Sequence, residues 1–279
     1  MTDPTIRDTW QEGGAYDRYI GRWSQGIAPL FLSWLEIPAG RRWLDVGCGT
    51  GALCAAILQH ATPAMLTGIE PSEGFLSVAR QHLPASVRLC GGSAASIPLQ
   101  DGEVDAVVSG LVLNFVPDVP RALAEMARVA ATGGTVAAYV WDYAEGMEML
   151  RHFWDVAADL DPDAVQLHEG TRFKLCRRDA LRSAFEEAGL CDVVVAPLVI
   201  AMSFTSFEDY WQPFLGAQGP APAYVASLPE ERRIRLRDAL RARLPVGSDG
   251  ALVLRGRAWA VRGTAQQGGR ASDQADGPR

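Results

Sequence analysis

The chain has 279 residues, a formal net charge of −7 and a pI near 5.2. Proteins that bind nucleic acid usually present a basic face to the phosphates, so this charge argues against a nucleic-acid partner. Hydrophobic residues make up 48% of the chain, but no apolar run reaches the roughly 18 residues of a membrane span. The polar start up to Gln11 lacks a signal peptide's apolar stretch. Five scattered cysteines without metal-ligand spacing favour reduced thiols, no bound metal and a cytoplasmic location.

The first predicted element is a leading helical region. Tyr16, Tyr19 and Ile20 share one face of a helical pattern that continues to Leu35. We therefore expect residues 1–35 to form an N-terminal helical arm.

From Arg42 onward, predicted strands and helices alternate. This order predicts an α/β fold, with a mostly parallel sheet and helices on both faces. The strands are Arg42–Val46, Met65–Glu70, Val87–Cys90, Val104–Ser109 and Thr135–Trp141, and the helices are Ala52–Gln59, Glu73–His82 and Val119–Ala130.

The pattern changes after the fifth strand. Helices are predicted over Gly146–Leu160 and Arg177–Gly189, followed by a strand over Asp192–Ala201. Ser203–Leu244 is mainly helical with aromatic residues at its start, and a last strand follows over Ala251–Val261. We expect lid insertions at about 142–176 and 203–250, and a disordered tail over 264–279 because that segment is rich in Gly, Gln, Ser and Asp.

The turn after the first strand carries the clearest chemical signal. An acid, Asp45, precedes a turn with glycines at 47, 49 and 51, and a helix follows. Such a turn lets a ligand approach the backbone N–H groups at a helix start, as in nucleotide-cofactor sites. Asp45 would repel a pyrophosphate but attract the ammonium and sulfonium of S-adenosylmethionine (SAM), so we favour SAM.

A dinucleotide cofactor remains the alternative. Gly47-x-Gly49-x-x-Ala52 also fits the loose dinucleotide pattern. Glu70, at the end of the second strand, can bind the two hydroxyls of a ribose in either cofactor class.

Three segments together resemble the class I SAM-dependent methyltransferases of the small-molecule, ubiquinone-biosynthesis-like type. They are Asp45–Gly51, Glu70–Ser72 and Asp105–Ser109, and the resemblance covers roughly Tyr16 to Trp141. It implies a Rossmann-like seven-stranded sheet over 36–263, with the last strand antiparallel between strands five and six. It also implies SAM as cofactor, with S-adenosylhomocysteine (SAH) as product, and it leaves the methyl acceptor open.

The resemblance also suggests which residues contact the cofactor. The arm is expected to cover the methionine end, with Arg22 a candidate for meeting the SAM carboxylate. The full candidate set is Asp45, Gly47, Cys48, Gly49, Gly51, Glu70, Pro71, Ser93, Ala94, Leu111, Tyr16, Tyr19 and Arg22.

Two positions depart from the family pattern. Relatives commonly have an aspartate that binds the adenine amino group where this chain has Ser93, and often a histidine near Asn114. A serine bonds more weakly than a carboxylate, and an asparagine is no general base at neutral pH. The catalytic residues are therefore undefined; the candidates are His168, His152, Asp142 and Asn114.

The sequence thus favours a SAM-dependent methyltransferase for a small-molecule acceptor, working as a monomer or homodimer without a membrane or nucleic-acid partner. Two alternatives stay open: an NAD(P)-dependent Rossmann oxidoreductase, and a SAM-binding protein without catalytic activity.

Overall fold

A seven-stranded sheet forms the centre of the computed structural model, which describes residues 20–216 and 219–266. The strand order is β3-β2-β1-β4-β5-β7-β6. Strands β3, β2, β1, β4 and β5 are parallel, and β7 runs antiparallel to both β5 and β6. The predicted mixed sheet, with the last strand between the fifth and sixth, is therefore confirmed. The strands are β1 (Arg42–Val46), β2 (Met65–Glu70), β3 (Arg88–Gly91), β4 (Val104–Gly110), β5 (Ala130–Trp141), β6 (Cys191–Phe204) and β7 (Leu252–Thr264).

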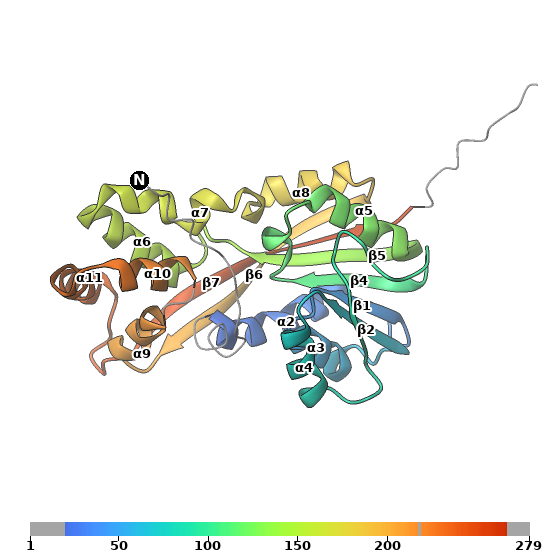
Figure 1. The fold of residues 1–279 in the computed structure, drawn as a ribbon, viewed down its shortest axis with the longest axis horizontal. Helices are drawn as coiled ribbons and strands as arrows, with labels where there is room; N and C mark the ends of the chain where they lie inside the picture. Colours follow the sequence, from blue (N-terminus) through green and yellow to red (C-terminus); the bar gives the residue numbers. More distant parts are fainter. Residues whose placement is uncertain (1–19, 217–218, 267–279) are drawn as a thin grey trace, which may run out of the picture.

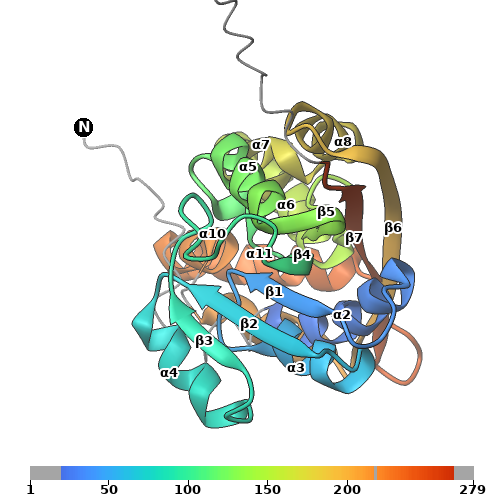
Figure 2. The same ribbon diagram turned by 90° about the vertical axis from the view of Figure 1, so that its right-hand side faces the viewer.

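Helices cover both faces of this sheet (Figures 1 and 2). One face carries α5 (Val119–Val129) and α8 (Arg178–Glu187), and the other carries α2 (Arg22–Leu35), α3 (Ala52–His60) and α4 (Glu73–His82). Side chains from both layers bury the central strands, which explains why β1 and β2 read as apolar runs rather than alternating patterns.

Strands β6 and β7 are the longest in the described chain, with 14 and 13 residues. They run past the end of the parallel sheet to a group of helices that we call the cap (Figure 1). The cap contains α6 (Glu148–Leu160), η3 (Pro162–Leu167), α7 (Glu169–Arg172), η4 (Lys174–Cys176), α9 (Phe207–Trp211), η5 (Gln212–Leu215), α10 (Pro220–Ser227) and α11 (Glu230–Arg243). No helix in the described segments is long and apolar enough to cross a membrane.

Aromatic side chains hold the cap together. The ring of Phe153 in α6 stacks on that of Phe214 at 4.6 Å between centroids, and it meets Trp154 edge-on at 5.0 Å. The hydroxyl of Tyr210 donates a hydrogen bond to the carbonyl of Met149 at 2.9 Å. The aromatic residues at 204–214 thus form the cap's own core.

Some element boundaries differ from the sequence prediction. β5 begins at Ala130 rather than Thr135, because Ala130 pairs with Val104 across a bulge. β7 extends to Thr264, which pairs with Thr135, so this residue belongs to the sheet and not to the expected tail. The rest of that tail, from 267 onward, lies outside the described residues, as do Tyr16 and Tyr19. The division into arm, main domain and lid insertions stays a prediction.

Candidate functional site

The turn between β1 and α3 requires glycine for two different reasons. Gly47 and Gly49 have φ values of +74° and +53°, in the left-handed region that side chains disfavour. A Cβ on Gly47 would lie 2.6 Å from Cγ1 of Val112, whereas a Cβ on Gly49 would have no atom within 4 Å. The N–H of Gly47 donates to the carbonyl of Ile69 at 2.9 Å and ties the turn to β2. One side of the turn is therefore packed and the other is open.

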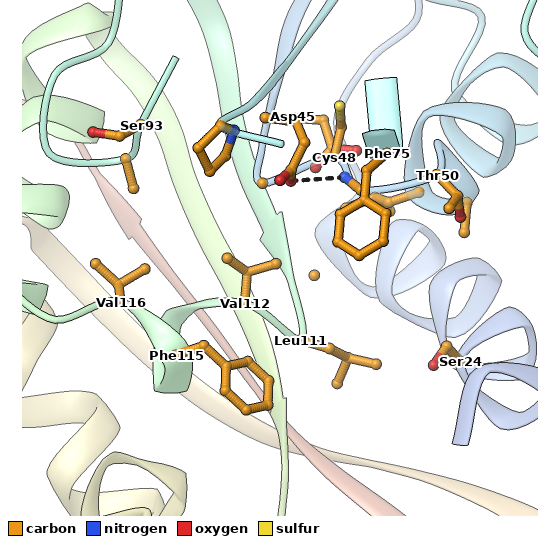
Figure 3. A pocket seen from close by; sticks show the side chains of 18 of the residues that line it. Ser24, Asp45, Cys48, Thr50, Phe75, Ser93, Leu111, Val112, Phe115 and Val116 are labelled. Carbon is orange, nitrogen blue, oxygen red and sulfur yellow. Dashed lines mark hydrogen bonds between the residues drawn. The ribbon is translucent and has the colours of Figure 1, made fainter. Parts of the chain in front are cut away.

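A cavity of about 580 Å³ opens beside this turn (Figure 3). It lies beyond the carboxyl ends of β1, β2 and β4, at the point between β1 and β4 where the strand order reverses. Open parallel sheets bind ligands at this position, and the volume suits a small molecule or cofactor. Figure 3 shows Ser93 and Val116 at one end of the cavity, and Thr50 and Ser24 at the other.

Most of the predicted cofactor residues border this cavity. Those that do are Asp45, Gly47, Cys48, Gly49, Glu70, Pro71, Ser93, Ala94 and Leu111. They come from four separate segments of sequence, at or just after the ends of β1, β2, β3 and β4, which the parallel sheet brings to one edge.

Asp45 is a buried carboxylate with incomplete hydrogen bonding. Its side chain is 1% exposed, and Oδ2 accepts a hydrogen bond from Sγ of Cys54 at 3.2 Å. Oδ1 is buried and has no partner among the described residues. Burial raises the pKa of Asp45 to about 7, the nearby Glu70 charge adds to this rise, and the Cys54 bond opposes it. A cationic group in the cavity would satisfy Oδ1 and favour the ionised form.

Glu70 is held in place by the backbone on both sides. Oε1 accepts from the N–H of Ser72 at 3.0 Å, and Oε2 accepts from the N–H of Gly49 at 3.2 Å. Burial raises its pKa, and these two backbone donors counteract the rise. Each carboxylate oxygen keeps further acceptor capacity, so the fixed carboxylate can still bind a pair of hydroxyls.

Leu111 marks the end of β4 with an unusual backbone. Its φ is +61°, a conformation that a branched residue rarely adopts, and its N–H donates to the carbonyl of Tyr139 at 2.8 Å. Such conformations often occur where a strand end meets a ligand site. Here the conformation precedes Val112, whose side chain packs against Gly47.

Arg22 does not border the cavity. Its Nη1 pairs with Oδ1 of Asp209 at 2.9 Å, and its guanidinium lies over the rings of Trp23 and Phe204, at 4.3 and 4.8 Å. The arginine therefore joins α2 to the cap, where its charge is already partnered. The predicted contact with a cofactor carboxylate would require this pair to open.

The leading helix reaches the cavity through other residues. Ser24 and Ala28 of α2 border it, whereas Tyr16 and Tyr19 lie outside the described residues. Gly51 lies behind the turn, where a Cβ would be 2.7 Å from Cδ1 of Leu83. Its role is to let the turn pack against α4.

None of the four catalytic candidates borders the cavity. Asp142 accepts a hydrogen bond from Nε of Arg257 at 2.7 Å and caps the turn that leads into α6. Nδ1 of His168 accepts from the N–H of Gly170 at 2.8 Å and caps α7. Both residues are engaged in local structure.

The remaining two candidates are also placed away from the cavity lining. His152 lies in α6, and burial lowers its pKa. Asn114 lies in η2 (Leu113–Phe115), and its Nδ2 is buried without a partner among the described residues. Across those same residues, no group of three or more His, Cys, Asp or Glu side chains is arranged to hold a metal.

The sequence analysis did not predict the part of the cavity wall that is formed by the segment after β4 and by β5. Phe115, Val116 and Asp118 line the cavity, and so does Tyr139. The available signal was topological: Phe115 to Asp118 follow the carboxyl end of a central parallel strand, which is where ligands bind in such sheets.

A doubly wound sheet with a glycine turn at its switch point defines a Rossmann-like cofactor-binding protein. Residues 44–138 match the family described as "Methyltransferase domain". A demethylmenaquinone methyltransferase of Geobacillus kaustophilus is 30% identical over 185 residues, covering 61% of this chain and 79% of that protein. The chain belongs to the class I SAM-dependent methyltransferases.

Other relatives match over a shorter span. An uncharacterized methyltransferase of Mycobacterium tuberculosis is 39% identical over 129 residues, which is 46% of this chain and 49% of that protein. The chain thus spans about half the length of these mycobacterial relatives.

Solved structures show the same fold at low identity. The YcgJ protein of Bacillus subtilis is 17% identical with a TM-score of 0.55, covering 88% of this chain and 100% of that one. Phosphoethanolamine N-methyltransferase 2 of Haemonchus contortus, solved with phosphomonomethylethanolamine and S-adenosylhomocysteine, is 15% identical with a TM-score of 0.55, covering 91% and 57%. Both likenesses concern the fold alone.

Proposed function

We propose that this chain binds SAM in the cavity and transfers its methyl group to a neutral, largely apolar small molecule. The observation that carries the proposal is the unpartnered Oδ1 of Asp45 beside an open glycine turn. SAM presents an ammonium group that could supply the missing donor. The pyrophosphate of a dinucleotide would be repelled by the same carboxylate, which argues against the oxidoreductase alternative.

Each end of the cavity then has a role. Asp45 and the turn would hold the amino-acid end of the cofactor, near Ser24 of α2, and Glu70 would bind the ribose hydroxyls. The base would lie toward Ser93. SAM brings the activated methyl group, so the protein's task is to place the acceptor in line with it and to exclude water.

The charge of the lining supports a neutral acceptor. The described lining contains three carboxylates, those of Asp45, Glu70 and Asp118, and no lysine, arginine or histidine. An anionic acceptor would enter without a counter-charge, which is costly in an apolar cavity. Phe115 offers apolar contact instead. Demethylmenaquinone, the neutral compound after which the Geobacillus relative is named, fits this lining.

The first test is calorimetric titration of the purified protein with SAM, SAH and NADH in parallel. We expect micromolar binding of the two adenosyl compounds and none of NADH, and we expect Asp45→Ala to abolish SAM binding. Binding of NADH alone, or undiminished SAM binding by the variant, would overturn the cofactor assignment.

A second arm tests catalysis with the same protein. Mass spectrometry should detect methylation of a neutral demethylmenaquinol analogue and none of phosphoethanolamine. Tight SAM binding with no transfer to any of a broad panel of neutral, cationic and anionic acceptors would favour the non-catalytic SAM-binding protein. Preferred methylation of the phosphorylated compound would contradict the charge argument.

A further inference from the structure

The base end of the cavity has a gap in its polar lining. Ser93, Ala94 and Ala95 border it, so the loop after β3 offers one hydroxyl and two methyl groups there. A hydroxyl forms a neutral hydrogen bond, roughly half as strong as the bond formed by a carboxylate. Another residue would have to supply strong recognition of a base at this end.

Asp118 lies at the same end. It follows Val116 and Pro117 in sequence, all three border the cavity, and Val116 lies on the Ser93 side (Figure 3). Oδ1 of Asp118 accepts from the N–H of Arg121 at 3.0 Å and caps α5. Oδ2 has no hydrogen bond or ion pair with any residue in the described part of the chain. One carboxylate oxygen thus fixes the side chain, and the other remains available.

The loop after β3 is docked on the same helix. Nε of Arg121 donates to the carbonyl of Ala95 at 3.2 Å, and the N–H of Ile97 donates to Oε2 of Glu125 at 2.9 Å. Glu125 is in turn paired with Arg128, at 2.8 Å. These bonds hold the loop that carries Ser93 at a fixed position relative to Asp118, so both walls of the base end belong to one framework.

We propose that Oδ2 of Asp118 accepts a hydrogen bond from the exocyclic amino group of the adenine base, and that Asp118 thereby selects adenine. This inference rests on the proposed function, because it assumes an adenosyl cofactor in the cavity. An ionised carboxylate only accepts hydrogen bonds. It therefore favours a base with an amino group at this position and disfavours one with a carbonyl oxygen there.

The test compares two ligands that differ at this one position: SAH, and its deaminated form S-inosylhomocysteine. For the unmodified protein we expect calorimetry to show about 10- to 100-fold tighter binding of SAH, the range of one hydrogen bond to a charged group. In Asp118→Asn the cap of α5 is kept, since asparagine is a good N-cap, and its amide can donate to the carbonyl of hypoxanthine. The ratio of affinities should then fall at least about tenfold.

Two further variants make the result decisive. Asp118→Ser also keeps a side chain that can cap α5, but it has no carboxylate, so the ratio of affinities should fall in this variant as well. Its melting temperature checks that α5 is intact. In Ser93→Ala the ratio should stay close to that of the unmodified protein. The proposal would be overturned if both Asp118 variants kept the same ratio of SAH to S-inosylhomocysteine affinity as the unmodified protein. It would also be overturned if Ser93→Ala lost that ratio. Failure of SAH to bind the unmodified protein would instead overturn the proposed function.

Discussion

Asp45 is the residue at which folding and ligand binding conflict most directly. Burial raises its pKa from 3.8 to about 7, so the ionised form is destabilised inside the protein. That difference corresponds to about 4 kcal/mol of unfolding free energy, lost when the buried carboxyl group ionises. A carboxylate retained at such a cost is typical of a functional site.

The first prediction concerns the pH dependence of this cost. Because the folded-state pKa is raised, the penalty is absent below the unfolded pKa of 3.8 and is complete above about 7. Asp45→Asn removes the charge, so we expect it to increase the unfolding free energy by about 1–3 kcal/mol at pH 8, with the gain shrinking toward pH 4. Urea unfolding at several pH values measures this difference.

Asp105 offers a control of opposite sign. It accepts hydrogen bonds from Arg42, which lower the pKa of Asp105 to about 2. A lowered pKa stabilises the fold above about 3.8, and this stability is lost as the pH falls through about 2. Asp105→Asn should therefore destabilise the protein about equally at pH 8 and pH 5. A gain for Asp45→Asn that did not change with pH would contradict the assigned burial cost.

The glycine turn leads to a prediction at the scale of elements. Gly47→Ala would place a Cβ 2.6 Å from Val112, whereas Gly49→Ala would place one in open space. Both have positive φ, which costs about 1 kcal/mol for alanine. We expect Gly47→Ala to lose a further 1–3 kcal/mol through overpacking. We expect Gly49→Ala to lose only about this shared 1 kcal/mol. It should weaken SAM binding at least about tenfold, because Gly49 lines the cavity and its N–H positions Glu70.

Thermal melting and calorimetric titration of the two variants separate these effects. If Gly47→Ala and Gly49→Ala lost the same stability and bound SAM equally well, the distinction between a packed Gly47 and a ligand-facing Gly49 would be wrong.

Elements with strong local signals could be predicted from the sequence. β2 and α4 have the predicted boundaries, because Ser72 caps α4 and Pro84 follows its end. The start of β5 could not be predicted, since Ala130 joins the sheet only through its pairing with Val104. That pairing depends on a distant segment and not on the strand propensity of Ala130.

The same reasoning applies to the candidate site. Asp45 and Glu70 lie in short motifs at strand ends, so the sequence placed them at one edge of the sheet. The partner of Arg22, Asp209, is 187 residues away, and no local pattern reports such a contact. Asp118 reads as an ordinary helix cap, and only the fold shows that the residue also borders the cavity.

At the scale of the whole molecule, the described cavity lining comes from the sheet edge and its adjoining loops and helices, and none of it comes from the cap helices α6, α9, α10 or α11. The cap instead contacts the wall of the cavity from outside: Phe115 of the wall meets Phe173, whose ring lies 5.3 Å away between η4 and α7. We therefore expect cofactor affinity and methyl transfer to respond to different buried residues.

Two buried phenylalanines test this separation of cofactor affinity from methyl transfer. Phe153 stacks on Phe214 in the cap. The ring of Phe31 in α2 lies 4.7 Å from that of Tyr139, which lines the cavity. Each change to alanine should cost about 3–5 kcal/mol of stability. In Phe153→Ala we expect the Kd for SAM to stay within about threefold. Methyl transfer should fall by about tenfold or more, because a loosened cap supports Phe115, the proposed acceptor contact, less well through Phe173. In Phe31→Ala the Kd for SAM itself should rise about tenfold.

Calorimetry and initial-rate measurements at low temperature, where both variants remain folded, give the Kd for SAM and the rate of methyl transfer. Equal loss of SAM affinity in the two variants would contradict this separation. It would mean that a packing defect in the cap core alters the cofactor cavity as much as a defect beside Tyr139 does.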